Sequence, residues 1–223
     1  MKNLLKMGGI AALIGAATNL MAIVTFITLG PKGFGSSDPG QVVAFLANNQ
    51  AFMRVFDIIS YLVFGVSLIF LSLALHERLK AGSSPTLAQA VTVFGLIYAV
   101  LVIVSGTLEI SILNTVVKLF VENPAQAATA WLTLNSVASG LGGGGGETLV
   151  NALWILLLSW VALRARELPR VFNYLGLVIG VAGILTVLLT SFLPMAVVYG
   201  LGLIIWLAWL GIVILRRSPV SEA

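Results

Sequence analysis

Three carboxylates stand inside apolar stretches of this sequence, where an ionisable side chain is rare. They are Asp57 in FMRVFDIIS, Glu109 in SGTLEISILN, and Glu147 at the end of a run of five glycines. A charged group within a hydrocarbon layer is costly, and such residues mark ion, proton or ligand sites. The three acids are therefore the candidate ligand-binding residues.

Polar neighbours extend this set. Arg54 precedes Asp57 by three residues, so the two side chains can pair along one helix face. The residues expected at a similar depth are Asn114, Asn135, Asn151 and Tyr199. One hypothesis is a shared pocket for a cation, an amine head or a proton. The alternative, left open here, is that each carboxylate faces interfacial water or caps a neighbouring helix.

Catalytic and metal chemistry find little support. The chain has no cysteine and one histidine, His76, which excludes thiolate metal sites, two-histidine metal sites and bis-histidine haem. No serine lies in a nucleophile-elbow motif. The glycine run is not a phosphate loop, because Glu147 stands where such a loop carries lysine. We expect no catalytic residue, no metal and no cofactor.

The composition predicts a membrane protein. Of 223 residues, 59% are hydrophobic and only 9% are charged, and the mean hydropathy is +1.08. Soluble domains carry about a quarter charged residues. The net charge of +4 suits lysines and arginines that meet lipid headgroups, so we expect membrane lipids and no nucleic acid as partners.

Stretches of about 20 apolar residues can cross the hydrocarbon core. The fold expected is all-α, with six transmembrane helices in one bundle that forms a single domain over residues 1–223. The predicted spans are roughly 7–29, 52–75, 87–113, 148–163, 171–190 and 195–215.

The basic residues predict the orientation. With the N-terminus inside, the cytoplasmic side holds nine of them: Lys2, Lys6, Arg78, Lys80, Arg164, Arg166, Arg170, Arg216 and Arg217. The outer side holds three, Lys32, Arg54 and Lys118. Cytoplasmic loops of membrane proteins carry the excess of Lys and Arg. Both termini are therefore expected in the cytoplasm.

Two outer connections have helix-start signals. Asp38-Pro39 is followed by Gln41 in a capping-box pattern, and Asn123-Pro124 opens a segment that carries Trp131. Both segments are predicted to be short amphipathic helices at the outer interface or packed over the bundle, with Trp131 at headgroup level. The glycine run is expected to end the second helix and open the fourth span, and a role in lining a cavity stays open.

Residues 147–188 resemble the membrane family called domain of unknown function 4386. Leu168, Pro169, Arg170, Gly176 and Gly183 carry the match, in the fourth span, the basic turn and the glycine-bearing fifth span. Glu109 resembles an acidic residue typical of the family's third span. The resemblance implies a six-helix bacterial or archaeal membrane protein, and it implies no activity.

Two functions follow as hypotheses. The first is a protein of the prokaryotic plasma membrane that binds or passes a small ligand, a cation or a lipid head through an outward-facing acidic pocket. The second is an accessory structural subunit of a larger membrane complex, motivated by small-residue helix faces that favour close helix packing, in this chain or in a homo-oligomer. An enzyme that acts on lipids through a carboxylate pair is the least favoured, because no nucleophile accompanies the acids.

Overall fold

The computed structural model describes residues 2–82, 85–143, 145–189 and 193–217, and all of the regular structure in these ranges is helical. Six helical stretches in them are long and apolar enough to cross a membrane. The prediction of an all-α membrane protein with six spans is therefore confirmed. In chain order the elements are α1 (Lys2–Leu29), η1 (Gly30–Lys32), α2 (Pro39–Asn48), α3 (Gln50–Asp57), η2 (Ile58–Val63), α4 (Phe64–Gly82), α5 (Pro85–Glu122), α6 (Pro124–Leu141), α7 (Gly146–Ala165), α8 (Arg170–Leu188) and α9 (Leu193–Arg217).

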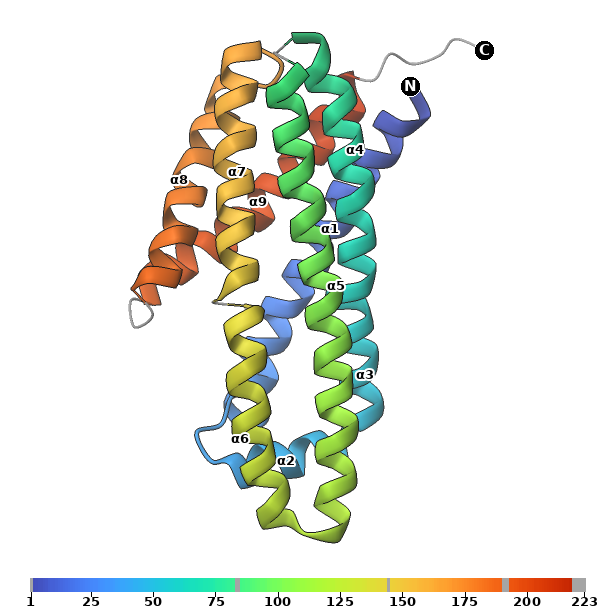
Figure 1. Cartoon of the computed structure of the whole chain (residues 1–223), viewed down its shortest axis with the longest axis vertical. Helices are drawn as coiled ribbons and strands as arrows, with labels where there is room; N and C mark the ends of the chain where they lie inside the picture. Colours follow the sequence, from blue (N-terminus) through green and yellow to red (C-terminus); the bar gives the residue numbers. More distant parts are fainter. Residues whose placement is uncertain (1, 83–84, 144, 190–192, 218–223) are drawn as a thin grey trace.

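Six helices pack side by side in a ring that we call the bundle: α1, α4, the N-terminal half of α5, α7, α8 and α9 (Figure 1). Around the ring, α1 lies between α4 and α9, while α7 lies between α5 and α8. The interior is filled by large side chains, including Trp154, Trp206 and Phe172, none of which is exposed.

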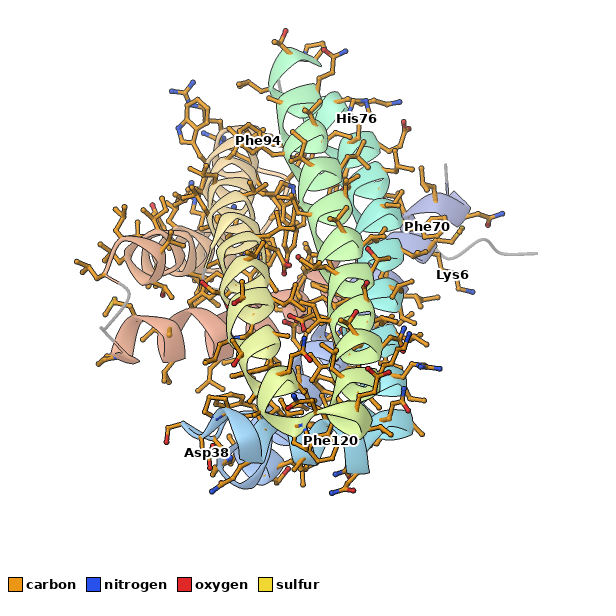
Figure 2. All side chains as sticks on the ribbon, turned by 60° about the horizontal axis from the view of Figure 1, so that its bottom comes forward. Lys6, Asp38, Phe70, His76, Phe94 and Phe120 are labelled. Atoms are coloured by element: carbon orange, nitrogen blue, oxygen red, sulfur yellow. The ribbon has the colours of Figure 1, made fainter. Side chains whose placement is uncertain are left out.

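A second packed region, the cap, lies at one end of the bundle. It consists of η1, α2, α3, the C-terminal half of α5, and α6, and α2 crosses this end of the molecule (Figure 1). Its apolar core is a separate cluster that includes Val42, Val43, Ile112 and Val116. Asp38 and Phe120 lie at the cap end and His76 and Phe94 at the other (Figure 2).

The exposed face of α5 changes character along its length. Its exposed side chains are apolar from Val93 to Val104 and then become polar, at Thr107, Ser111, Asn114, Thr115 and Lys118. The stretch from Gln89 to Thr107 covers about 27 Å at 1.5 Å per residue. A hydrocarbon core is about 30 Å thick. The length of this stretch is therefore close to the thickness of a hydrocarbon core.

The two predicted outer helices form, with different placements. The Asp38 carboxylate accepts a hydrogen bond from the Gly40 amide at 2.9 Å, and Asn123 caps α6 in the same way through Gln126. Gln41 does not close a capping box, because its side chain accepts from Ser36 instead. Only α2 lies across the bundle; α6 has 18 residues and stands end to end with α7 (Figure 1).

The glycine run ends α6 and opens α7, as predicted. The Gly142 amide donates to Ala138 at 2.8 Å, and the Gly145 amide donates back to Gly142 at 2.9 Å. A Cβ atom on Gly145 would overlap the carbonyl oxygen of Gly140. The turn between α6 and α7 therefore has no room for a side chain at Gly145.

The second span contains a π-helix, which the sequence did not predict. α3, η2 and α4 form one continuous run from Gln50 to Gly82, in which Ile58–Val63 is wound as a π-helix. The third helix is also longer than predicted, because α5 continues through the cap to Glu122. Single π-helical turns occur frequently at functional sites.

Candidate functional site

The cap encloses a cavity of about 170 Å³ that contains two of the three predicted acids. Asp57 and Glu109 both line it, from the end of α3 and from α5. The other lining residues are Phe34, Leu46, Met53, Phe56, Tyr61, Ile112, Leu113, Trp131 and Asn135. Four aromatic rings and one amide thus surround two carboxylates.

Asp57 is buried without a partner. It is 6% exposed, and no hydrogen bond or ion pair to it occurs within the described part of the chain. Glu109 is half-buried and also lacks such a partner there. Burying a carboxylate is costly unless it is paired and hydrogen-bonded. The cavity therefore holds two groups that a cation or a hydrogen-bond donor would satisfy.

Tyr61, in the π-helix, connects the cavity to the third acid. Its side chain lies directly against Gly106 of α5, where a Cβ would overlap it. The carboxylates of Glu109, Glu147 and Asp57 all lie in its neighbourhood. Tyr61 could not be selected from the sequence. Its direction depends on the π-helical turn of η2, and no local sequence signal predicts that turn.

Glu147 does not line the cavity and has different surroundings. It lies in the first turn of α7, next to Ser105 of α5 and within electrostatic range of Glu109. Its Oε2 atom is buried and has no hydrogen-bond partner. One turn further, the Asn151 amide nitrogen donates to the Tyr199 hydroxyl at 2.6 Å. Asp57 and Glu109 therefore line the cavity, whereas Glu147 lies outside it, beside Ser105.

Arg54 and Asn114 lie outside the cavity. The Arg54 guanidinium donates to the Asn114 side-chain oxygen at 2.6 Å, and both residues are exposed. No ion pair joins Arg54 to Asp57 among the described residues, so the pairing that the spacing allows does not form. On this helix the arginine faces out of the cap while the aspartate faces in.

Trp131 also lines the cavity. It comes from α6, whereas Tyr61 and Phe56 come from the second span. Phe34 comes from the segment after η1 and stands 6.5 Å from Phe56 between ring centroids. In the sequence, Trp131 lies one helical turn before Asn135. This spacing is the signal that could have selected it.

His76 lies at the other end of the molecule (Figure 2). Its Nδ1 atom is 2.9 Å from the Thr92 hydroxyl of α5. Within the described ranges, no three His, Cys, Asp or Glu side chains come together as a group that could hold a metal ion. The chemistry available in the cap is therefore that of carboxylates, aromatic rings and amides.

Comparison with known proteins gives one match. The family model described as domain of unknown function (DUF4386) matches residues 7–214. No curated protein and no solved structure matches the chain. The match covers four of the six membrane-crossing helices completely, most of the first and last, and every lining residue of the acidic cavity.

Proposed function

Since this chain belongs to the DUF4386 family, whose description gives no activity, we propose a function from the geometry of the cap: the protein binds a cation, or the cationic head of a lipid-like molecule, in the acidic cavity. The observation that carries the proposal is that Asp57 and Glu109, both without protein partners, line one cavity together with aromatic rings. This proposal makes the protein a binding or permeation protein rather than an enzyme.

The composition of the wall favours an organic cation. An aromatic face attracts an ammonium group within about 6 Å of its centre, and quaternary ammonium ligands are held in such cages. Trp131, Tyr61, Phe34 and Phe56 supply rings, and the two carboxylates supply charge. A volume of about 170 Å³ corresponds to roughly five or six water molecules at about 30 Å³ each. The cavity therefore accommodates a small amine or quaternary ammonium head.

A neighbouring groove supports the lipid-like version. It has a volume of about 500 Å³ and is lined between α1 and α4 by apolar side chains such as Ile10, Ile14 and Phe70. Its wall includes Leu62 and Val63 of η2, the π-helix that also brings Tyr61 to the cavity. A molecule with an apolar tail in this groove and its head in the cap would contact both faces of η2.

The proposed setting is a prokaryotic plasma membrane with the cap on the outer side. The starts of α1, α5 and α8 and the ends of α4, α7 and α9 lie away from the cap (Figure 1). Most of the basic residues belong to these segments, while Lys32, Arg54 and Lys118 belong to the cap. An excess of Lys and Arg favours the cytoplasmic side. The acidic cavity would then be reached from outside the cell.

The accessory-subunit hypothesis has less support, because the small-residue faces are used within the chain. Gly8 packs on Ala74, Gly9 on Leu215 and Gly180 on Leu156. Close contacts between helices at small residues are a general means of association in lipid. In this chain those contacts hold the bundle itself together.

Native mass spectrometry of the protein extracted gently from its membrane is the test. We expect a bound small molecule on the wild type that is lost from the double variant Asp57→Asn, Glu109→Gln. Titration of the emptied wild type with choline and with ethanolamine, followed by calorimetry, then gives the affinity for each head.

The matched control is Asp38→Asn, Glu122→Gln, which removes the same two charges from the cap outside the cavity. Asn caps a helix as well as Asp does, so this control keeps the start of α2. Equal loss of the bound mass in both double variants, or equal binding of both ammonium compounds by all three proteins, would contradict the proposal. A partner-sized mass would instead favour the accessory subunit.

A further inference from the structure

Three buried oxygen atoms next to the acidic cavity make no hydrogen bond of normal geometry, although the Ser105 hydroxyl lies close enough to the Glu147 carboxylate for a weak one. They are Oε2 of Glu147, the hydroxyl of Ser105 and Oδ1 of Asn151. Ser105 is 4% exposed and Asn151 is not exposed at all. Buried polar atoms in folded proteins are nearly always hydrogen-bonded, so each exception calls for an explanation.

The three atoms come from one small region. Ser105 and Glu147 are neighbours across the contact between α5 and α7. Asn151 follows Glu147 by four residues on α7, a spacing that places the two side chains one above the other. In the structure the Asn151 amide nitrogen donates to the Tyr199 hydroxyl, which leaves the amide oxygen without a partner.

The chemistry of this set is that of a site for a hard cation. A carboxylate, a hydroxyl and an amide carbonyl are all oxygen donors, and none of them is soft. One carboxylate balances one positive charge, whereas a divalent ion would leave an uncompensated charge in a buried site. From these three free oxygens we infer a second site, which binds a small monovalent metal cation between α5 and α7 through Glu147, Ser105 and Asn151.

The broken helix supports this placement. Gly142 lies against Ser105, since a Cβ on Gly142 would be 3.4 Å from the Ser105 hydroxyl oxygen. The end of α6 and the start of α7 therefore meet at the proposed site. Interrupted helices in membrane proteins expose carbonyl groups that coordinate Na⁺. The glycine run brings such a helix end next to the three side chains.

The second site is separate from the cavity. None of the three oxygens lines the cavity that contains Asp57 and Glu109. Tyr61 lines the cavity and has the acids of both sites in its neighbourhood. The inference goes beyond the proposed function and stands if the cavity takes no ligand.

The test is thermal unfolding of the detergent-purified protein as NaCl, or KCl, replaces N-methyl-D-glucamine chloride at constant ionic strength. A ligand that binds only the folded state raises Tm with its concentration. We expect a saturable rise with at least one of the two metal ions. Glu147→Gln should abolish the rise, because glutamine has nearly the same shape and no charge.

Ser105→Ala gives a milder test with its own control. This variant removes one neutral oxygen ligand of the proposed three and leaves the charge of Glu147 in place. We expect Ser105→Ala to need about ten times more metal ion for the same rise. Ser159 is also buried with an unpartnered hydroxyl, but it lies three turns further along α7, so Ser159→Ala should respond as the wild type does.

Four results would overturn the inference. They are no rise with either ion, an unchanged rise in Glu147→Gln, an equal shift in the two serine variants, and a rise produced by Ca²⁺ but by neither monovalent ion. The cavity variant Asp57→Asn, Glu109→Gln separates the two sites. This variant should keep the rise in Tm. If the rise is instead lost in this variant and kept in Glu147→Gln, the metal ion binds at the cavity.

Discussion

In the bundle, aromatic rings meet glycines at helix crossings, whereas in the cap they surround a cavity. Gly95 lies against Ser72 and Trp154, and Gly176 lies in the same way against Ser159 and Trp206. Ring contacts continue through the bundle, with Trp154 and Trp206 at 6.1 Å and Trp206 and Phe172 at 5.1 Å between centroids. In the cap, Trp131 faces the cavity that holds the carboxylates.

This difference gives the two regions different packing. Side chains that touch on all sides gain many small dispersion contacts, and those beside a void lack partner atoms on one side. The bundle is therefore packed on all sides of its rings, whereas the rings of the cap have free surface toward the cavity.

The largest effect should come from removing a bundle tryptophan. Trp206 is fully buried and stacks on Phe172. Trp206→Ala is expected to lower the stability by about 3–5 kcal/mol, the usual cost of emptying a large aromatic site. Trp131→Ala should cost clearly less, because one side of its ring already faces a cavity. Thermal unfolding in detergent, followed by circular dichroism, checks the order, and equal losses would contradict the division between bundle and cap.

The next largest loss of stability should come from the turn between α6 and α7, where the cap meets the bundle. Gly145→Ala places a Cβ on the Gly140 carbonyl, and overpacking of this kind costs about 1–3 kcal/mol. Gly143→Ala is the control, since a Cβ there meets no atom within 4 Å. We expect a lower Tm and weaker ligand retention in the first variant only. A tolerated Gly145→Ala would show that the α6–α7 crossing adjusts freely.

The carboxylates of the two regions should respond with opposite signs. Glu167, beyond the end of α7, faces Arg78 at 3.7 Å, so Glu167→Gln should cost up to about 1 kcal/mol and lower Tm by about 2–4 °C. Asp57 is buried without a partner, so Asp57→Asn should leave Tm unchanged or raise it in the absence of ligand. Unfolding scans of both variants beside Glu122→Gln, an exposed acid, give the comparison. A lower Tm for Asp57→Asn would mean that its carboxylate stabilises the cap.

The smallest effect should come from Arg54. Its hydrogen bond to Asn114 is exposed, and such bonds contribute about 1 kcal/mol or less. Arg54→Ala and Asn114→Ala should retain the bound mass that native mass spectrometry detects on the wild type. Loss of that mass in either variant would return both residues to the binding site.

Much of the fold could be predicted because it depends on local properties. The six spans follow from apolar length, and the caps at Asp38 and Asn123 follow from side chains that bind amides two or three residues away. The depth of Asp57 and Glu109 follows from the helix rise alone. The length of α5 was underestimated, because polar residues of the cap ended the apolar pattern before the helix ended.

The site could be predicted only in part. The spacing of Arg54 and Asp57 allows a pair, but the packing of α3 turns the arginine outward to Asn114 and the aspartate inward. Tyr61 and Trp131 were missed as cavity residues, because the first depends on a π-helical turn and the second on where α6 stands. Neither property can be predicted from the neighbouring residues in the sequence.

The sequence by itself determined that this chain is a six-span helical membrane protein of the DUF4386 family. These properties depend on hydropathy and on 1.5 Å per residue, which every helix shares. Only the tertiary structure decided that Asp57 and Glu109 share a cavity and that Glu147 lies beside Ser105 instead. The physical reason is that the rotation of each helix about its axis is set by contacts with its neighbours, through residues far apart in the chain.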